Sequence, residues 1–149
     1  ALEKYHSDRV AGFQQVIREM GLDEDEDLVR LAGTKPGAGY EQMQHLLALP
    51  HPPTAVMTIH DPLAIECLQA AIEKGLHVPE QVAIVGSDNM RDTLSNQPPL
   101  TTIHPPLAEM GRRAMEGLIQ QLSDEKAPPT RLILPTKLVV RQSTVGEMG

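Results

Sequence analysis

The chain has 149 residues and a formal net charge of −7 at pH 7, and this length suits a single domain with its own core. The acidic balance argues against a surface that binds nucleic-acid phosphates, and a chain with no Trp, one Phe and two Tyr lacks aromatic platforms for stacking bases. Cys67 is the only cysteine, which excludes an intrachain disulfide, and no apolar run has the length of a membrane span.

The first third of the chain alternates between helical and strand-like patterns. Apolar residues recur at helical spacing over residues 8–21, where Gly21 suits the end of the helix. Residues 28–32 are a short strand candidate, residues 40–47 predict a second helix, and residues 54–59 predict a buried strand.

The middle of the chain continues this alternation. Asp61 can cap the next helix and Pro62 fits its first position, because both residue types are favoured there. The apolar pattern of this helix ends at Gly75. Residues 82–85 and 100–103 are the next two strand candidates.

The end of the chain adds a helix and two strand-like runs. The helix starts after Pro106 and carries one apolar stripe, formed by Leu107, Met110, Ala114, Leu118 and Leu122. A loop is expected at residues 123–130, and residues 132–134 and 137–140 are strand-like. Because strands that alternate with helices of this length pair in parallel, we expect an α/β fold, with a parallel sheet flanked by helices.

Polar side chains follow several of these strands. In an open parallel sheet, ligands bind beyond the carboxyl ends of the strands. The helix that carries Arg9 would follow a strand upstream of this chain, so Arg9 is expected at the same edge. The side chains expected at this rim are Arg9, Thr34, His60, Asp61, Asp88 and Asn89. Such a set suits a hydroxyl-rich ligand, because carboxylates accept hydrogen bonds from hydroxyls and Arg donates them.

Patterns for other chemistry are incomplete. The acidic run at residues 23–27 lacks the Gly and Glu that an EF-hand loop needs at its sixth and twelfth positions. The Gly-rich segment at residues 35–39 lacks the spacing of a phosphate-binding loop. The histidines form no HxxxH pair, and no Ser lies in a G-x-S-x-G elbow. We therefore expect no catalytic residue, no metal site and no cofactor.

Four ordered motifs carry a family resemblance. Residues 9–13 match R-x-x-GF, and residues 53–61 match PTA(I/V) followed by an ND pair. Residues 78–89 match VP-x-D-V-x-(I/V)-VG-(F/Y)-D-(D/N), and residues 98–111 match P-(P)-LTTI-x-x-P-x-x-x-MG. In this order the motifs resemble the C-terminal part of the effector domain of LacI/GalR-type transcriptional repressors. The resemblance implies a periplasmic-binding-protein-like fold of type I.

The resemblance also implies roles for single residues. Arg9 and Asp88 match effector-contacting positions, and His60 stands where the family usually has an effector-contacting Asn. Thr34 lies near the family's aromatic stacking position, and Ser87 replaces an aromatic residue. Structural roles near the site are expected for the remaining rim residues, Asp61 and Asn89.

The resemblance further predicts how the chain is divided. Residues 1–103 would form the C-terminal effector-binding lobe without its first strand. Residues 104–134 would form a crossover helix and a return that pack on an absent N-terminal lobe, and residues 135–149 a final strand and tail. DNA would be contacted only through an absent N-terminal domain.

The helix over residues 62–74 is apolar on more than one stripe, so part of it is available for a second chain or for the core of its own chain. In the resembling family the equivalent helix contributes to a homodimer. The residues expected at that interface are Leu63, Ala64, Cys67, Leu68 and Ala71.

Three functions remain open at this stage. The first is the effector-sensing and dimerising part of a cytoplasmic LacI-type regulator that binds a small polar metabolite, a sugar or a derivative. The second is a periplasmic sugar-binding protein of a transporter, which shares the two-lobed fold. The third, an α/β enzyme, is disfavoured because the sequence shows no nucleophile, metal set or cofactor fingerprint.

Overall fold

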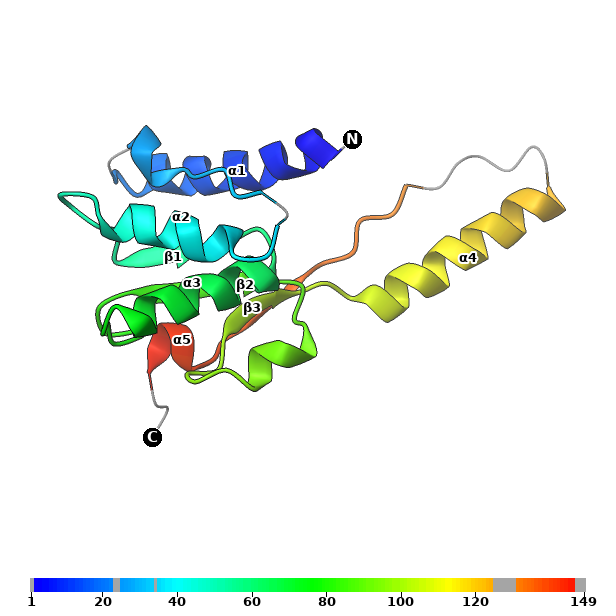
Figure 1. The fold of residues 1–149 in the computed structure, drawn as a ribbon. Coiled ribbons are helices and arrows are strands. Elements are labelled where there is room, and N and C mark those ends of the chain that lie inside the picture. The colour runs from blue at the N-terminus through cyan, green and yellow to red at the C-terminus, as the bar shows by residue number, and fades with distance from the viewer. Residues whose placement is uncertain (1, 23–24, 34, 125–130, 147–149) are drawn as a thin grey trace.

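Figure 1 shows the fold in a computed structural model that describes residues 2–22, 25–33, 35–124 and 131–146. The helices are α1 (Leu2–Glu19), α2 (Ala38–Leu47), α3 (Asp61–Glu73), α4 (Leu107–Ser123) and α5 (Gln142–Val145), with 3-10 turns at Glu26–Leu28 and Arg91–Leu94. The strands are β1 (Ala55–Met57), β2 (Ala83–Ser87), β3 (Thr101–His104) and β4 (Lys137–Val139). The four helices predicted from apolar spacing are all present, whereas the short α5 was not predicted.

The strands form one four-stranded sheet in the order β1-β2-β3-β4. Strand β1 pairs in parallel with β2, and β2 with β3, whereas β4 is antiparallel to β3. The α/β fold is confirmed, but the prediction of a uniformly parallel sheet is wrong at β4. The chain leaves the sheet at the carboxyl end of β3, runs out along α4 and returns through residues 131–136, so β4 enters beside the end of β3 and runs back (Figure 1).

The core lies between α3 and the sheet, and α2 packs on the other side of α3. The Gly-rich segment at residues 35–39 allows α2 and α3 to pack closely. The Glu66 carboxylate accepts hydrogen bonds from the backbone N–H groups of Gly37 and Gly39, each at 2.7 Å, and so caps the start of α2. A Cβ on Gly39 would lie 2.7 Å from the carbonyl oxygen of Leu63, which explains why the two helices require glycine there.

The five residues predicted for a dimer interface lie instead in the core of their own chain. Leu63, Ala64, Cys67, Leu68 and Ala71 are all buried, and Leu68 is only 2% exposed. Helix α3 is apolar on two sides because one side meets α2 and the other meets the sheet. The interface prediction for these side chains is therefore wrong.

Two strand predictions are also wrong. Residues 28–32 fall on the end of a 3-10 turn and an irregular segment, in which Leu31 is 91% exposed. Residues 132–134 are irregular as well. A strand needs a neighbouring backbone to complete its hydrogen bonds, and among the described residues no strand lies beside either segment. The predicted loop at residues 123–130 begins one residue later than expected, because Ser123 ends α4, and residues 125–130 lie outside the described part.

Helix α4 projects away from the sheet, and residues 131–136 run back toward the sheet (Figure 1). None of its residues is buried, although its sequence carries a complete apolar stripe. Leu107, Met110, Leu118 and Leu122 are all exposed within the chain. Helix α4 therefore buries little of its surface against the rest of the chain. Several of its residues instead line a groove beside the sheet.

Candidate functional site

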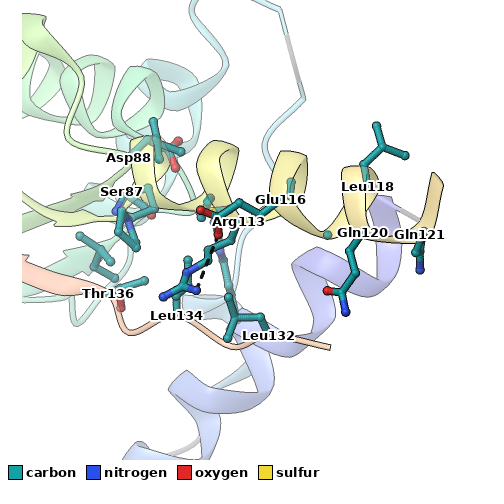
Figure 2. A pocket seen from close by; sticks show the side chains of 18 of the residues that line it. Ser87, Asp88, Arg113, Glu116, Leu118, Gln120, Gln121, Leu132, Leu134 and Thr136 are labelled. Atoms are coloured by element: carbon teal, nitrogen blue, oxygen red, sulfur yellow. Dashed lines mark ion pairs between the residues drawn. The ribbon is translucent and has the colours of Figure 1, made fainter. Parts of the chain in front are cut away.

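A groove of about 1040 Å³ lies at the carboxyl edge of the parallel strands. Its floor is formed by Met57 and Thr58 at the end of β1, by Ser87 and Asp88 at the end of β2, and by Ile103 in β3. Figure 2 shows α4 running away from Ser87 and Asp88, with the return segment that carries Leu132, Leu134 and Thr136 passing below the helix. The open-sheet rule therefore predicts the location of the groove correctly.

The opposite wall comes from α4 and the return segment. Met110, Arg113 and Glu116 of α4 line it, together with Leu132 and Leu134. Arg113 reaches Glu116 across one turn at 3.7 Å, the ion pair drawn in Figure 2. The groove thus combines a polar floor with a mixed apolar and charged wall.

Arg9 and Asp88 line the same groove, as the sequence predicts. A guanidinium nitrogen of Arg9 donates a hydrogen bond to the carbonyl oxygen of Ile59, which follows β1. This contact links α1 to the segment that follows β1. Asp88 is half-buried, and in the part of the chain that the structure describes no group donates a hydrogen bond to its carboxylate. The Asp88 carboxylate is therefore available to accept hydrogen bonds from a ligand in the groove.

The turn that carries Asp88 has a left-handed backbone. Asp88 has φ 107° and Asn89 has φ 51°. The Asp88 N–H donates to the carbonyl oxygen of Ile103 at 2.8 Å, and the Asn89 N–H donates to Thr102 Oγ1 at 3.1 Å. These bonds fix the turn against β3.

Asp61 joins three parts of the rim. Its side chain is fully buried, and its two carboxylate oxygens accept hydrogen bonds from Thr102 Oγ1 at 2.6 Å and from the Met90 N–H at 2.7 Å. Asp61 is not the N-cap that the sequence predicts, because these tertiary partners occupy its carboxylate. The cap is His60, whose Nδ1 accepts from the Leu63 N–H at 3.4 Å.

The other predicted contacts are not brought into the groove. His60 is half-buried and caps α3, and it does not line the groove. Thr34 lies outside the described residues. Asn89 bonds to Arg141 and His104 behind the turn, and it does not line the groove either.

Sequence reasoning missed Arg141, which lies between β4 and α5. Its guanidinium donates to the carbonyl oxygen of Leu100 at 2.5 Å, to Thr93 Oγ1 at 3.0 Å and to Asn89 Oδ1 at 2.6 Å. All of these partners lie at least 41 positions away in the chain. No local spacing could therefore have signalled this role.

Two groups have strongly shifted pKa values. The guanidinium groups of Arg112 and Arg113 donate hydrogen bonds to Glu109 and lower its pKa to about 2. Burial in the core raises the pKa of Cys67 to about 12, with a smaller contribution from nearby Glu66. The Cys67 thiol, which donates to the carbonyl oxygen of Gly39 at 3.4 Å, therefore stays protonated and is a poor nucleophile.

The described residues contain no group of three His, Cys, Asp or Glu side chains placed to hold a metal ion. Across the same residues, no helix combines the length and hydropathy needed to cross a membrane.

Comparison with known proteins identifies the family. Residues 1–144 match the family described as periplasmic binding protein-like domain. The chain belongs to this family. The HTH-type transcriptional repressor PurR of Escherichia coli is 35% identical over 135 residues, which make up 91% of this chain and 40% of PurR. The chain thus spans about 40% of the length of the curated relatives it matches.

Solved structures of family members agree with this result. A regulatory protein of the LacI family from Chloroflexus aggregans superposes with a TM-score of 0.86 at 28% identity, covering 93% of this chain and 50% of that one. The transcriptional regulator CelR in complex with cellobiose gives 0.83 at 31% identity, covering 91% of this chain and 41% of that one. The resemblance to the effector domain of LacI/GalR-type repressors is confirmed.

Proposed function

We propose that this chain is the C-terminal effector-binding lobe of a LacI-type transcriptional regulator and that its groove binds a small polar metabolite, a sugar or a derivative. The observation that carries this proposal is the pairing of Arg9 with Asp88 on one groove, where the Asp88 carboxylate has no donor among the described residues. A sugar hydroxyl supplies the missing donor, and the same ligand accepts from the arginine.

The rest of the groove suits such a ligand. Thr58 and Ser87 are buried polar residues on the floor, whereas Met57 and Ile103 add apolar surface beside them. Small-molecule sites commonly combine apolar walls with a few polar groups that fix the orientation of the ligand. CelR, whose structure contains cellobiose, has the same fold over 91% of this chain.

The remaining functional assignments extend this proposal to the parent regulator. Residues 1–103 form the effector lobe, residues 104–134 the crossover to the other lobe, and residues 135–149 the final strand and tail. The regulator acts in the cytoplasm as a homodimer and contacts DNA through a part outside this chain. PurR is a transcriptional repressor and the Chloroflexus aggregans protein is a regulatory protein of the LacI family, which favours regulation over catalysis and over transport binding.

Replacing Asp88 by Asn tests the proposal. The Asn amide has the shape of the Asp88 carboxylate but no charge. The binding free energy for the true ligand should therefore weaken by about 1.5–3 kcal/mol, which lowers the affinity tenfold or more. NMR shift titration of the chain with a panel of sugars, beginning with cellobiose and sucrose, detects even weak binding. The matched control is Asp92→Asn, because Asp92 is exposed and does not line the groove. Equal affinity of the unchanged chain and the Asp88→Asn variant would remove Asp88 from the site.

A further inference from the structure

The turn that presents Asp88 adopts a backbone conformation that is unfavourable for both of its residues. Asn and Asp enter the left-handed region more readily than other residues, but φ 107° at Asp88 lies beyond its usual range. Such conformations persist where surrounding contacts enforce them. The contacts that hold this turn therefore decide where the Asp88 carboxylate lies.

Arg141 makes the most extensive of these contacts. Its guanidinium reaches Asn89 Oδ1 at 2.6 Å while it also donates to the carbonyl oxygen of Leu100 at 2.5 Å. Its own backbone N–H donates to Thr101 Oγ1 at 2.8 Å, which fixes Arg141 to β3. The arginine is thus anchored to the sheet on one side and holds the turn on the other.

The Asn89 side chain is fixed at both ends. Because arginine can only donate, Asn89 must turn its oxygen toward Arg141, and its Nδ2 then faces His104 Nδ1 at 3.2 Å. The Asn89 N–H is also engaged by Thr102 Oγ1. An amide held in this way cannot rotate, and the residue before it in the chain is Asp88.

We infer that Arg141 is a positioning residue: through Asn89 it holds the turn in its left-handed form and so aims the Asp88 carboxylate into the groove. Arg141 itself does not line the groove, so it acts on a ligand only through the turn. Its effect on ligand affinity rests on the proposed function, whereas its effect on the turn does not.

Backbone NMR of the chain tests the effect on the turn without any ligand. In Arg141→Met the stem remains but the donors are lost. The amide shifts and HN–Hα couplings of Asp88 and Asn89 should change, while those of α2 should stay the same. Asn89→Ala removes the same link from the other side and should change the Asp88 signals too, which provides a second route if Arg141→Met does not fold. The control is Arg112→Met, because Arg112 is exposed on α4 and does not line the groove. Unchanged Asp88 and Asn89 signals in a folded variant would overturn the inference.

A rescue experiment separates positioning from general stabilisation. Glycine adopts positive φ without side-chain support, and an Asn89→Gly background also lacks the side chain that Arg141 holds, so Arg141 can no longer act on the turn through residue 89. Adding Arg141→Met there should change the Asp88 signals much less than it does in the unchanged chain. Equal changes in the two backgrounds would show that Arg141 acts elsewhere.

Ligand titration then distinguishes the two possible failures, with cellobiose as the first probe. If Arg141 aims a ligand-binding carboxylate, Arg141→Met should weaken binding about as much as Asp88→Asn, by tenfold or more. A turn that moves while Asp88→Asn leaves affinity unchanged contradicts the proposed function and supports the positioning role. A loss of affinity in Asp88→Asn with an unmoved turn in Arg141→Met contradicts the positioning role alone.

Discussion

Gly86 shows how tightly one backbone position near the site is constrained. A Cβ at this position would lie 2.3 Å from Asp61 Oδ1 and 3.2 Å from atoms of Ala64 and Leu100. Asp61 cannot move away easily, because its carboxylate is buried and accepts hydrogen bonds from two other elements. The glycine at the end of β2 therefore allows α3 to approach the strand closely.

Gly86→Ala should lower the free energy of unfolding by about 1–3 kcal/mol, because overpacking a core forces the backbone apart. Urea denaturation measures this change. Gly111→Ala is the matched control, because Gly111 lies in α4 and a Cβ added there would have nothing within 4 Å, and Ala is favoured over Gly in a helix by about 1 kcal/mol. Equal midpoints for the two variants would show that the close contact at Gly86 does not limit stability.

At the scale of whole elements, α3 is the main core helix. Leu68 is 2% exposed, whereas Ile72, one turn later on the same helix, is 45% exposed. Leu68→Ala should cost about 2–5 kcal/mol, the range for deleting a buried leucine side chain, and Ile72→Ala should cost much less. Denaturant unfolding of the two variants compares them directly. A small cost at Leu68, with a change in oligomeric state, would restore the dimer-interface prediction.

The stability of helix α4 depends in part on ion pairs along its surface. Hydrogen bonds from Arg112 and Arg113 lower the pKa of Glu109 from 4.5 to about 2. Because the folded-state pKa is lowered, the stabilising effect is present above 4.5 and is lost as the pH falls toward about 2. Arg112 and Arg113 are exposed and Glu109 is partly exposed, so salt should screen the effect.

Circular dichroism as a function of pH measures this dependence. Helicity should decrease between about pH 5 and about pH 2, and the decrease should be smaller in Glu109→Gln and at high salt. Glu80→Gln is the control, because Glu80 is exposed and makes no ion pair among the described residues. Identical acid profiles for Glu109→Gln and the unchanged chain would contradict a role for these ion pairs.

Local sequence pattern predicted elements better than it predicted their partners. Helix α3 follows from apolar spacing, because its apolar side chains are buried on two sides. Strand β3 was expected at residues 100–103, although two of its buried residues, Thr101 and Thr102, are polar. The direction of β4 could not be predicted, since strand residues look the same in either direction. The N-cap was misplaced by one residue because Asp61 bonds to Thr102 and Met90, which are distant in sequence. The same reason hides Arg141, whose contribution to the site depends on partners in other elements.

For the molecule as a whole, the arm formed by α4 and the return segment is one of the regions that expose large apolar side chains. Leu107, Leu118 and Leu122 are 61%, 50% and 76% exposed, and Ile133 on the return is 79% exposed. Leaving such side chains in water forgoes about 1.5–3 kcal/mol for each one. CelR and the LacI-family protein of Chloroflexus aggregans are about twice as long as this chain or longer, which leaves room for a second lobe in those proteins.

We therefore predict that the isolated chain associates through α4 unless another lobe covers it. Sedimentation should show species larger than a monomer, and ANS fluorescence should report exposed apolar surface. Leu118→Glu places a charge in the stripe and should shift the chain toward monomer. Gln120→Glu adds the same charge two residues along the same helix, outside the stripe, and should leave association unchanged. A second lobe would supply further walls to the groove, so sugar binding by the isolated chain should be weak. A compact monomer with little ANS signal and tight sugar binding would mean that these 149 residues form a self-sufficient sensor.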